Sequence, residues 1–458
     1  TTVDLLPAGC GLRLALGEDV TSFTTLTKTL AHMARHDAGT GLLNAQALAE
    51  TLDARALAPG YALAFLRLHG LTELADLYGH TLSREVAQAV VSLLRPLLPA
   101  ALWGFKPPNA LVLAHTELPV LSEFVAEAAH MLEYPVMAEG AQWQLSLHTG
   151  IARYPQDGTE AEQVLACAAL AARSRGSEHD PAQPTHYAAA LGEHSRRRRR
   201  MAVELRRAIR EGELEVHFQP IVRAAAEPGA APACKYEALS RWQLDGEPVS
   251  PAEFIPIVES AGLSGALLRL VIGRACEAIV ALRARGSEAR VTVNVPAVAS
   301  VMRDLPEDLT ALCAAHGVAT SSIGIEITES TFFDDDGSWR ATFARLRGMG
   351  VQVAIDDFGT GFNSLVCLER LPADAIKLDR TFIAQIFSSG RQARICAALI
   401  RLAHELGLEV VAEGVEEEEQ RAWLREHGCD ELQGYLLGRP SPLAQLLEPE
   451  PESAGRAA

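Results

Sequence analysis

Short apolar runs alternate with long segments of helical spacing along the second half of the chain. Eight of these runs are dense in Val, Ile and Leu, as parallel strands covered on both faces are. Helical spacing is clearest in residues 251–285, 340–349, 393–406 and 416–428, and each of these segments follows a strand-like run. A strand followed by a helix, repeated about eight times over roughly 240 residues, is the pattern of a (β/α)8 barrel. We therefore predict a TIM-like α/β barrel in this half.

Nearly every one of the eight runs ends in a carboxylate, an amide or an amine. Carboxylates are costly within apolar runs unless they meet metals or partners. In a (β/α)8 barrel the carboxyl ends of the strands meet at one mouth, where the catalytic residues of such enzymes lie. We therefore predict a catalytic site at this mouth. Its residues are Gln219, Glu237, Asn294, Glu326, Asp356, Asp357, Lys377, Glu413 and Gln433.

The oxygen-rich residues of this set predict a metal site. Hard oxygen ligands from four strand ends suit Mg²⁺ and Mn²⁺, whereas zinc would favour His or Cys. These four ligands are Glu237, Asn294, Glu326 and Asp356. Because Asp357 is adjacent to Asp356, one of these carboxylates can bridge two metal ions while the other binds the second ion. Two ions about 3.5–4 Å apart suit in-line cleavage of a phosphodiester. Ca²⁺ should inhibit, because it prefers longer bonds and more ligands.

Further roles are assigned to residues beside these ligands. Lys377 can orient the attacking water or meet the charge that develops on phosphate. Glu413 is a candidate general base, and Asp357 is counted among the catalytic residues as well as the ligands. The glycine-bearing loop that follows Asp357 is suited to a mobile element over the site. For Glu329 we favour support of the loop at 357–365 over direct chemistry.

The first half of the chain predicts a smaller α/β domain, because helical segments alternate with strand-like runs from about residue 36 to 187. Residues 174–187 are rich in Ser, Pro and Asp, which indicates a boundary. Five consecutive arginines at 196–200 are interpreted as the solvated face of a joining helix. The predicted division is an N-terminal segment with a linker helix at 1–34, the small domain at 35–190, a linker helix at 191–210, the barrel at 211–450 and a tail at 451–458.

Composition narrows the class of protein. The formal net charge of −17 argues against binding of a nucleic-acid polymer, since few Lys and Arg remain to neutralise phosphates. No apolar stretch reaches the roughly 18 residues that a membrane span needs. Eight scattered cysteines without a CxxC pair favour reduced residues in a cytoplasmic protein. The chain starts at Thr1 without a signal-peptide pattern, so we expect a fragment that lacks an upstream sensor domain.

The motifs that carry the predicted site resemble one known family. Residues from about 200 to 445 resemble an EAL domain, a family of cyclic di-GMP phosphodiesterases. The name-giving motif is Glu237-Ala238-Leu239, and FQPIV, NVP, EITES, AIDDFGTGF, IKLD, AEGVE and QGYLLGRP stand around it in the family's order. The resemblance implies two Mg²⁺ or Mn²⁺ ions, hydrolysis of one phosphodiester of cyclic di-GMP to linear pGpG, and homodimers formed through the EAL domain.

The resemblance also implies that Gln219 and Arg241 contact the substrate. The full substrate-binding set that we predict is Gln219, Arg241, Asp379, Glu416 and Gln433. Two departures from the family pattern lie near the mobile loop: Pro296 replaces a usual Ser, and Phe362-Asn363 replaces a usual Tyr-Ser. They bear on the rate of turnover more than on metal binding.

Residues from about 35 to 190 resemble a GGDEF, or diguanylate cyclase, domain through HDAGTGLLN, LYGH and GIARYPQDG. The catalytic signature of that family is missing. The segment Lys106-Pro107-Pro108-Asn109-Ala110 stands where Gly-Gly-Asp-Glu-Phe belongs, and Arg67 stands where a metal-binding Asp belongs. A site without its carboxylates cannot hold Mg·GTP, and two prolines cannot form the glycine turn that cradles phosphate. We expect this domain to be inactive as a cyclase and to serve regulation or dimerisation.

Together these observations predict a cytoplasmic, metal-dependent cyclic-di-GMP phosphodiesterase. One alternative is a non-catalytic receptor that binds cyclic di-GMP and signals to a protein partner. Another is an interaction scaffold in which both halves are regulatory. The presence of every expected ligand and of the base favours the enzyme. Turnover of cyclic di-GMP with and without Mg²⁺ separates the three.

Overall fold

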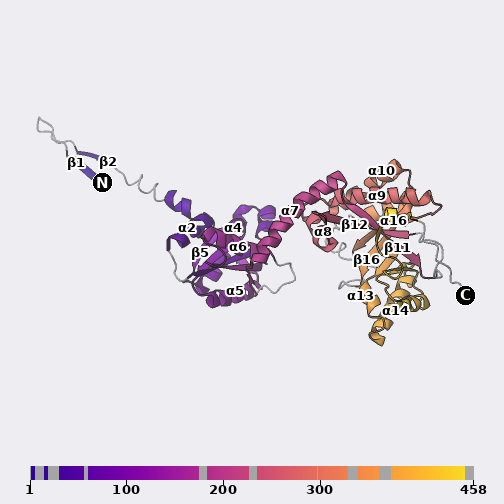
Figure 1. Cartoon of the computed structure of the whole chain (residues 1–458). Coiled ribbons are helices and arrows are strands. Elements are labelled where there is room, and N and C mark those ends of the chain that lie inside the picture. Colours follow the sequence, from indigo (N-terminus) through magenta and orange to yellow (C-terminus); the bar gives the residue numbers. More distant parts are fainter. Residues whose placement is uncertain are drawn as a thin grey trace. The chain divides into compact units, whose positions relative to one another are not determined.

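The computed structural model describes residues 2–5, 15–18, 30–55, 60–174, 183–225, 235–296, 298–328, 339–359 and 373–448. The chain divides into two compact units, Thr1–Arg197 and Arg198–Ala458 (Figure 1). A hairpin of β1 (Thr2–Leu5) and β2 (Ala15–Glu18) comes first along the chain. Helix α7 (Ala189–Glu211) covers the segment predicted as a linker helix, and the division between the units falls within it. Among the helices described, none combines the length and the apolar composition that crossing a membrane requires.

The first unit is built on a six-stranded sheet with helices on both faces. Along β4, Leu63 and Phe65 pack with helices α2 and α6, whereas Leu66 and Leu68 pack with α4 and α5, because successive side chains of a strand point to opposite faces. This is the smaller α/β domain that the sequence predicts. In sheet order the strands are β10 (Thr185–His186), β9 (Ser146–Tyr154), β4 (Tyr61–His69), β6 (Ala110–His115), β5 (Leu102–Lys106) and β3 (Leu43–Asn44). The helices are α2 (Ala45–Arg55), α3 (Leu71–Tyr78), α4 (His80–Leu94), α5 (Leu118–Leu132) and α6 (Ala161–Ala171), with a 3-10 turn at Arg95–Leu97 and a small hairpin of β7 (Val136–Ala138) and β8 (Ala141–Trp143).

The second unit is a closed barrel of eight strands, as the sequence predicts. Closure follows from β11, which pairs with β12 on one side and with β19 on the other. The barrel strands are β11 (Glu215–Arg223), β12 (Lys235–Leu244), β14 (Arg290–Asn294), β15 (Ile323–Thr328), β16 (Gln352–Phe358), β17 (Ala375–Leu378), β18 (Glu409–Ala412) and β19 (Glu431–Gln433), and β13 (Glu247–Val249) and β20 (Ser441–Pro442) pair at its margins.

Helices cover the outside of the barrel between consecutive strands, and apolar side chains from both fill the space between them. The longest of these in the described chain is α9, whose buried Ile272, Cys276 and Ile279 recur at helical spacing. The helices are α8 (Pro251–Ser260), α9 (Ser264–Arg283), α10 (Ala299–His316), α11 (Trp339–Gly348), α13 (Arg380–Ala384), α14 (Gly390–Glu405), α15 (Glu418–Glu426) and α16 (Leu443–Leu446), with a 3-10 turn at Thr320–Ser322.

The first barrel strand runs against the others, which differs from the regular repeat that the pattern predicts. β11 is antiparallel to both of its neighbours, whereas the other neighbouring barrel strands are parallel. The connection from Arg223 to Lys235 is too short for a helical crossover, which takes a dozen or more residues, so the two strands form a hairpin. Gln219 therefore reaches the level of the site by pairing directly with Glu237 and not by ending its strand.

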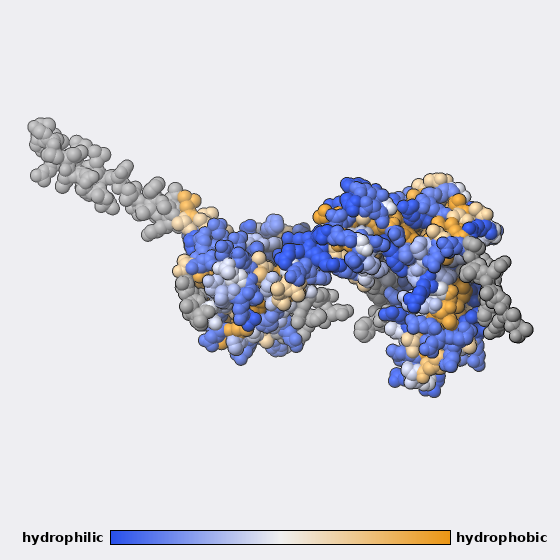
Figure 2. Space-filling model, viewed as in Figure 1, coloured by the Kyte–Doolittle hydropathy of each residue, from blue (hydrophilic) through white to orange (hydrophobic). Residues whose placement is uncertain are grey.

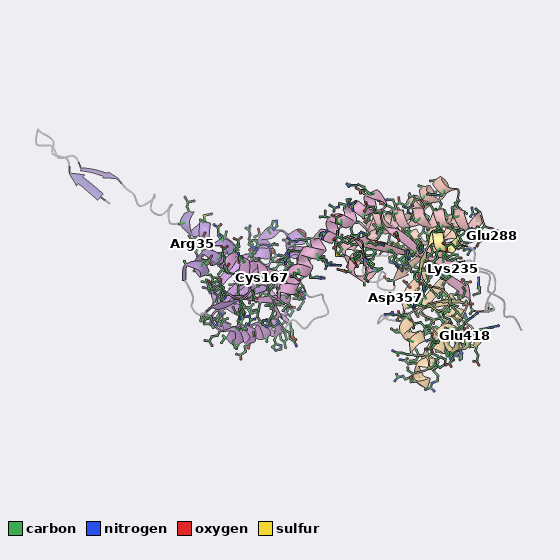
Figure 3. The ribbon with its side chains drawn as sticks, viewed as in Figure 1. Arg35, Cys167, Lys235, Glu288, Asp357 and Glu418 are labelled. Carbon is green, nitrogen blue, oxygen red and sulfur yellow. The ribbon has the colours of Figure 1, made fainter. Side chains whose placement is uncertain are left out.

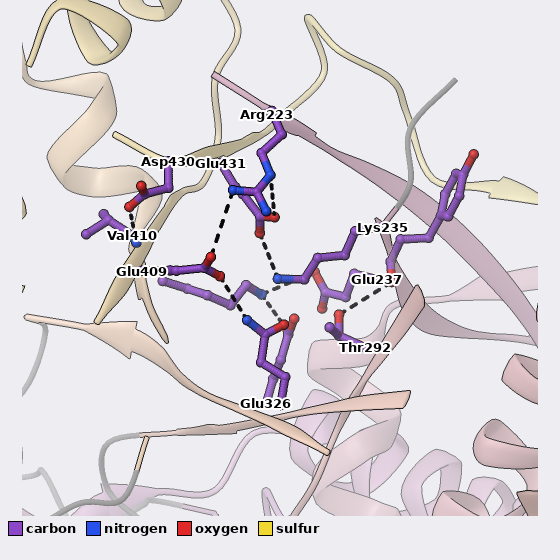
Figure 4. Close-up of polar contacts among 12 residues, drawn as sticks. Arg223, Lys235, Glu237, Thr292, Glu326, Glu409, Val410, Asp430 and Glu431 are labelled. Atoms are coloured by element: carbon purple, nitrogen blue, oxygen red, sulfur yellow. Dashed lines mark hydrogen bonds and ion pairs between the residues drawn. The ribbon is translucent and has the colours of Figure 1, made fainter. Parts of the chain in front are cut away.

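A polar network closes the end of the barrel opposite the predicted mouth (Figure 4). Lys235 Nζ lies 2.7 Å from Glu431 Oε2, and both side chains are buried. Arg223 lies 3.8 Å from both Glu431 and Glu409, and Gln352 donates a hydrogen bond of 3.0 Å to Glu409. Except for Arg223, which ends the antiparallel β11, these residues begin their strands, and this end of a barrel serves stability more than catalysis. Sequence analysis did not predict this network.

Hydrophilic residues cover most of the face shown in Figure 2, and apolar residues form small patches on each unit. Exposed examples are Val203, Phe387 and Tyr435. Scattered apolar residues are normal on a protein surface and indicate no binding site by themselves.

Candidate active site

A buried lysine lies at the centre of the predicted site. Lys377, from β17, is 1 % exposed, and its Nζ lies 2.5 Å from both Glu326 Oε2 and Glu413 Oε1. Its distance to Glu237 Oε2 and to Asp356 Oδ1 is 3.3 Å in each case. The lysine and its partners come from β12, β15, β16, β17 and the residue after β18, so the barrel brings together positions spread over 177 residues of sequence, from 237 to 413. The predicted convergence of these side chains is present in the structure.

Amide side chains hold Glu237 in place from two further strands. Asn294 Nδ2 donates to Glu237 Oε1, and Gln433 Nε2 donates to Glu237 Oε2, both at 2.6 Å. Gln433 Nε2 also lies 3.2 Å from Gln219 Oε1, and Gln219 in turn donates to the carbonyl of Gly438. The orientation of Glu237 is therefore set by its neighbours, and four of the predicted site residues form one hydrogen-bonded group.

The electrostatics show that this cluster carries more negative charge than it can compensate. Burial together with nearby carboxylates raises the pKa of Glu326 to about 8 and that of Glu413 to about 7, against the opposing effect of Lys377. Burial and the neighbouring Asp356 also raise the pKa of Asp357. Burial alone lowers the pKa of Lys377, but the surrounding carboxylates outweigh it and raise that pKa well above its usual value.

Glu237 differs from the neighbouring carboxylates because positive charge and hydrogen-bond donors compensate its negative charge best. Burial raises its pKa, but the charge of Lys377 and hydrogen bonds from Gln433 and Asn294 outweigh burial and lower it. The ionised form of Glu237 is therefore favoured, whereas burial and neighbouring carboxylates favour the protonated forms of Glu326 and Glu413.

A local irregularity in β16 places two successive aspartates at the same site. Neighbouring side chains of a strand normally point to opposite faces. The register of β16 shifts between Ile355 and Phe358, and Asp357 adopts φ +53°, a left-handed conformation that is uncommon for a residue other than glycine. As a result, carboxylate oxygens of Asp356, Asp357 and Glu413 lie within 4.8 Å of one another (Asp357 is labelled in Figure 3).

These residues fit a hard divalent cation. Their donors are carboxylate and amide oxygens, which Mg²⁺ and Mn²⁺ prefer. Asp356 Oδ1 and Gln433 Oε1 are buried but accept no hydrogen bond from any residue in the described part of the chain, although the former lies 3.3 Å from Lys377 Nζ. Glu237, Glu326, Asp356, Asp357 and Glu413 supply five negative charges against the single positive charge of Lys377.

The remaining predicted site residues differ in how they relate to this cluster. Half-buried Arg241 follows Glu237 by four positions on β12, so it points to the same side of the strand; it donates to the carbonyl of Ser240 and pairs with no described carboxylate. Asp379 caps α13, where its Oδ1 accepts from the backbone N–H of Thr381 at 2.9 Å, and Glu416 is exposed and meets no member of the cluster within the described residues.

Two of the predictions concern residues that the structure does not describe. Glu329 and most of the loop at 357–365, with Phe362-Asn363, lie outside the described residues.

Sequence reasoning did not single out Tyr435 and Arg439. The guanidinium of Arg439 lies over the ring of Tyr435, 4.2 Å from its centroid, and Tyr435 is close enough to Arg241 to act on its pKa. Both belong to the QGYLLGRP run that supplies Gln433, which is the signal that could have pointed to them.

In the first unit, the two features that predict an inactive cyclase lie on neighbouring strands. The segment Lys106–Ala110 forms the turn between β5 and β6 and contains a cis peptide bond between Pro107 and Pro108. Arg67 lies on β4, directly opposite Ala110 on one side and His148 on the other.

The family models agree with the division into two units. Residues 202–440 match the EAL domain, and residues 34–179 match the diguanylate cyclase, or GGDEF, domain. The chain belongs to the EAL family. Its EAL barrel follows a GGDEF domain, and the recognition and fold that the sequence predicts are confirmed.

Two similar proteins come from Pseudomonas aeruginosa. The chain is 34% identical over 434 residues to the cyclic di-GMP phosphodiesterase NbdA, covering 92% of this chain and 54% of NbdA. It is 30% identical over 440 residues to MucR, a bifunctional diguanylate cyclase/cyclic di-GMP phosphodiesterase, covering 93% of this chain and 63% of MucR. The chain thus spans only about half to two thirds of the length of these relatives. A solved structure of the MucR phosphodiesterase in complex with c-di-GMP covers 54% of this chain and 100% of its own, with 36% identity and a TM-score of 0.50.

Proposed function

We propose that the EAL barrel of this protein hydrolyses cyclic di-GMP to linear pGpG in a metal-dependent reaction. The observation that carries the proposal is the ring of four carboxylates around Lys377, with Asp357 beside it, whose donors suit hard divalent cations. The names of NbdA and MucR, together with the cyclic-di-GMP complex of the MucR phosphodiesterase, support this substrate.

The ligand set that we propose is Glu237, Asn294, Glu326, Asp356 and Asp357. Two Mg²⁺ or Mn²⁺ ions bound there would lower the pKa of a bound water, so that hydroxide is available to attack at neutral pH. They would also neutralise the phosphate oxygens during in-line displacement. Asn294 and Gln433 orient Glu237 through hydrogen bonds to its two oxygens. The positive charge of Lys377 reduces the repulsion among the carboxylates, and its ion pairs hold them in fixed positions.

Proton transfer and substrate binding fall to residues around this core. Glu413, whose pKa burial raises to about 7, is suited to accept a proton from the attacking water near neutral pH. Gln219, Arg241 and Gln433 are proposed to bind the substrate, with the Arg241 guanidinium directed at phosphate. The positions of Asp379 and Glu416 give less support to the substrate contacts predicted for them, since one caps a helix and the other is exposed.

The GGDEF unit is proposed to make no cyclic di-GMP and to act in regulation or dimerisation. Arg67 places positive charge where a cyclase would hold a cation, and Pro107 and Pro108 supply no backbone N–H to a phosphate. We further propose a homodimer formed through the barrel, a cytoplasmic location and an upstream sensor; the greater length of NbdA and MucR is compatible with such a further domain.

Chromatography of cyclic di-GMP incubated with the full chain tests the proposed function. We expect pGpG to form with Mg²⁺ or Mn²⁺ and not with EDTA, and Glu237→Gln to abolish its formation. The control is Glu215→Gln, an exposed carboxylate at the start of β11 that should leave turnover unchanged. Binding of cyclic di-GMP without cleavage over a range of Mn²⁺ concentrations would overturn hydrolysis in favour of a receptor.

A further inference from the structure

The short helix α13 packs directly against the turn that follows the two site aspartates. Gly359 comes two positions after Asp357, and a Cβ atom placed on it would lie 2.7 Å from two ring carbons of Phe382. Non-bonded carbon atoms are in favourable contact at about 3.5–4.0 Å, so no side chain fits between this ring and the backbone of residue 359. The ring of Phe382 therefore rests on the main chain of Gly359.

This contact lies just beyond an unusual backbone conformation. Asp357 has φ +53° and Gly359 has φ +95°, so both lie in the region that favours glycine. For an aspartate this conformation is costly, and it persists only where the surrounding structure enforces it. Between the two residues, Phe358 is fully buried and pairs with Leu378 of β17. The chain after Asp357 is therefore anchored twice, by the buried ring of Phe358 and by the ring of Phe382 on Gly359.

Phe382 is itself held in a fixed position. Asp379 Oδ1 accepts hydrogen bonds from the backbone N–H and the hydroxyl of Thr381, and the backbone N–H of Phe382 donates to the Asp379 carbonyl at 3.0 Å. The next residue, Ile383, is fully buried in the apolar cluster against which Phe382 packs. Because α13 follows β17 with one residue between them, the strand that carries Lys377 also sets the place of this ring.

A second glycine beside the site meets the same turn of α13. Gly414 directly follows Glu413 and has φ +68°, and a Cβ atom placed on it would lie 2.5 Å from the Cβ of Arg380. That contact involves a Cβ atom, which every residue except glycine has, whereas the contact at Gly359 involves the ring of Phe382. Substitution of Phe382 therefore removes the contact at Gly359 and leaves the one at Gly414 in place.

We propose that Phe382 is a positioning residue for Asp357. Its ring, packed on Gly359, keeps Asp357 in the left-handed conformation. This conformation places a carboxylate oxygen of Asp357 within 4.8 Å of those of Asp356 and Glu413, and Phe382 thereby sets the affinity of the site for a divalent cation. Groups that orient metal ligands typically contribute about 10- to 100-fold to metal affinity. The inference rests on the metal-dependent function proposed for the barrel and deepens it.

Binding of Mn²⁺ to the full chain without substrate, measured by the electron paramagnetic resonance of the free ion, tests this role. We expect Phe382→Ala to weaken Mn²⁺ binding at least about tenfold, as Asp357→Asn should. Phe382→Met should retain most of the affinity, because methionine is a flexible apolar side chain that can cover Gly359.

The matched control is Leu402→Ala on α14. Leu402 is half-buried and packs against the same apolar cluster as Phe382, so its removal should lower the urea midpoint of the barrel and leave the Mn²⁺ affinity unchanged. If Phe382 served stability alone, Phe382→Ala would behave in the same way as this control.

A double variant tests whether Phe382 acts through Gly359. Gly359→Ala places a Cβ against the ring and should itself weaken Mn²⁺ binding, which also provides a second test should Phe382→Ala fail to fold, as judged by circular dichroism. Combined with Phe382→Ala, the two losses should be less than additive, because both changes disturb one contact. In a Gly414→Ala background, whose clash does not involve the ring, Phe382→Ala should keep its full effect.

Three results would overturn the inference and leave the proposed function standing. One is equal Mn²⁺ affinity in wild type and in folded Phe382→Ala. Another is a loss of affinity in Leu402→Ala as large as that in Phe382→Ala. The third is full additivity of Phe382→Ala and Gly359→Ala, which would mean that the ring does not act through residue 359. A wild-type chain that binds no Mn²⁺ would overturn the metal-dependent function together with this inference.

Discussion

Replacing Lys235 with Met removes the ammonium from the closed end of the barrel and leaves the Glu431 carboxylate buried. The two groups are 2.7 Å apart, and their side chains are only 9% and 8% exposed. Removing one partner of a buried pair costs about 3–5 kcal/mol, because an uncompensated charge stays buried. Arg223 lies 3.8 Å from Glu431 but is 66% exposed, so it compensates only weakly. We expect the free energy of unfolding of the barrel to fall by about 3 kcal/mol, the lower end of that range.

A double variant separates the loss of the pair from the burial of a lone charge. Lys235→Met with Glu431→Leu removes both charges and should regain most of the stability, since apolar replacement of a buried pair is often neutral. Arg223→Ala is the control and should cost less than about 1 kcal/mol, as exposed pairs do. Hydrogen exchange in increasing urea, read on peptides from β12 and β19, reports on the barrel separately from the first unit. An unchanged midpoint in Lys235→Met, or a double variant as unstable as the single one, would refute the reasoning.

Four further outcomes are expected. Glu237→Gln, Asp356→Asn and Lys377→Ala should each lower turnover of cyclic di-GMP at least about 100-fold, roughly 2.7 kcal/mol of transition-state stabilisation, and near-normal kcat in any of them would contradict its role. Ca²⁺ in place of Mg²⁺ should stop hydrolysis in the chromatographic assay, and full activity with Ca²⁺ would count against the ligand geometry. The pKa values of His69 and His148 are lowered in the folded state, so the unfolded state takes up protons first as the pH falls. The free energy of unfolding of the first unit should therefore decline below about pH 6.5. Urea midpoints at pH 8 and 5.5 measure this decline, and His148→Gln should flatten it. Removing residues 1–190 should change the rate or the oligomeric state of the barrel, measured by turnover and light scattering. A fragment with the same rate and oligomeric state as the full chain would show that the first unit has no regulatory role.

The location of the barrel mouth could be predicted from the sequence because the polar residues interrupt apolar runs at their ends. A carboxylate at such a position is conspicuous, and the topology of parallel strands brings these ends together. The hydrogen bonds of Asn294 and Gln433 to Glu237 join residues that lie 57 and 196 positions apart from it, and only the closed barrel makes them neighbours.

The finer geometry could not be predicted from the same pattern. Period-two alternation places Asp356 and Asp357 on opposite faces, and the irregularity of β16 that unites them depends on the pairing with β17. The antiparallel direction of β11 likewise follows from the length of one connection and not from the composition of the strand. Lys235 and Glu431 begin their strands, where a charged residue is common and conveys no sign that it is buried.

The two ends of the barrel use the same residue types with opposite consequences. At the closed end, Lys235 and Arg223 face Glu431 and Glu409, so positive and negative charges are equal in number. At the mouth, the ion pairs within the described residues join Lys377 to four carboxylates, Glu237, Glu326, Asp356 and Glu413. Balanced charges compensate one another, so loss of one partner destabilises the fold whereas loss of the pair costs little. Burial and unbalanced negative charge raise the pKa of Glu326 and Glu413, and a divalent cation bound there would relieve the repulsion by displacing their protons. The ratio of ammonium and guanidinium groups to carboxylates, more than the presence of either, distinguishes a structural end of this barrel from a chemically active one.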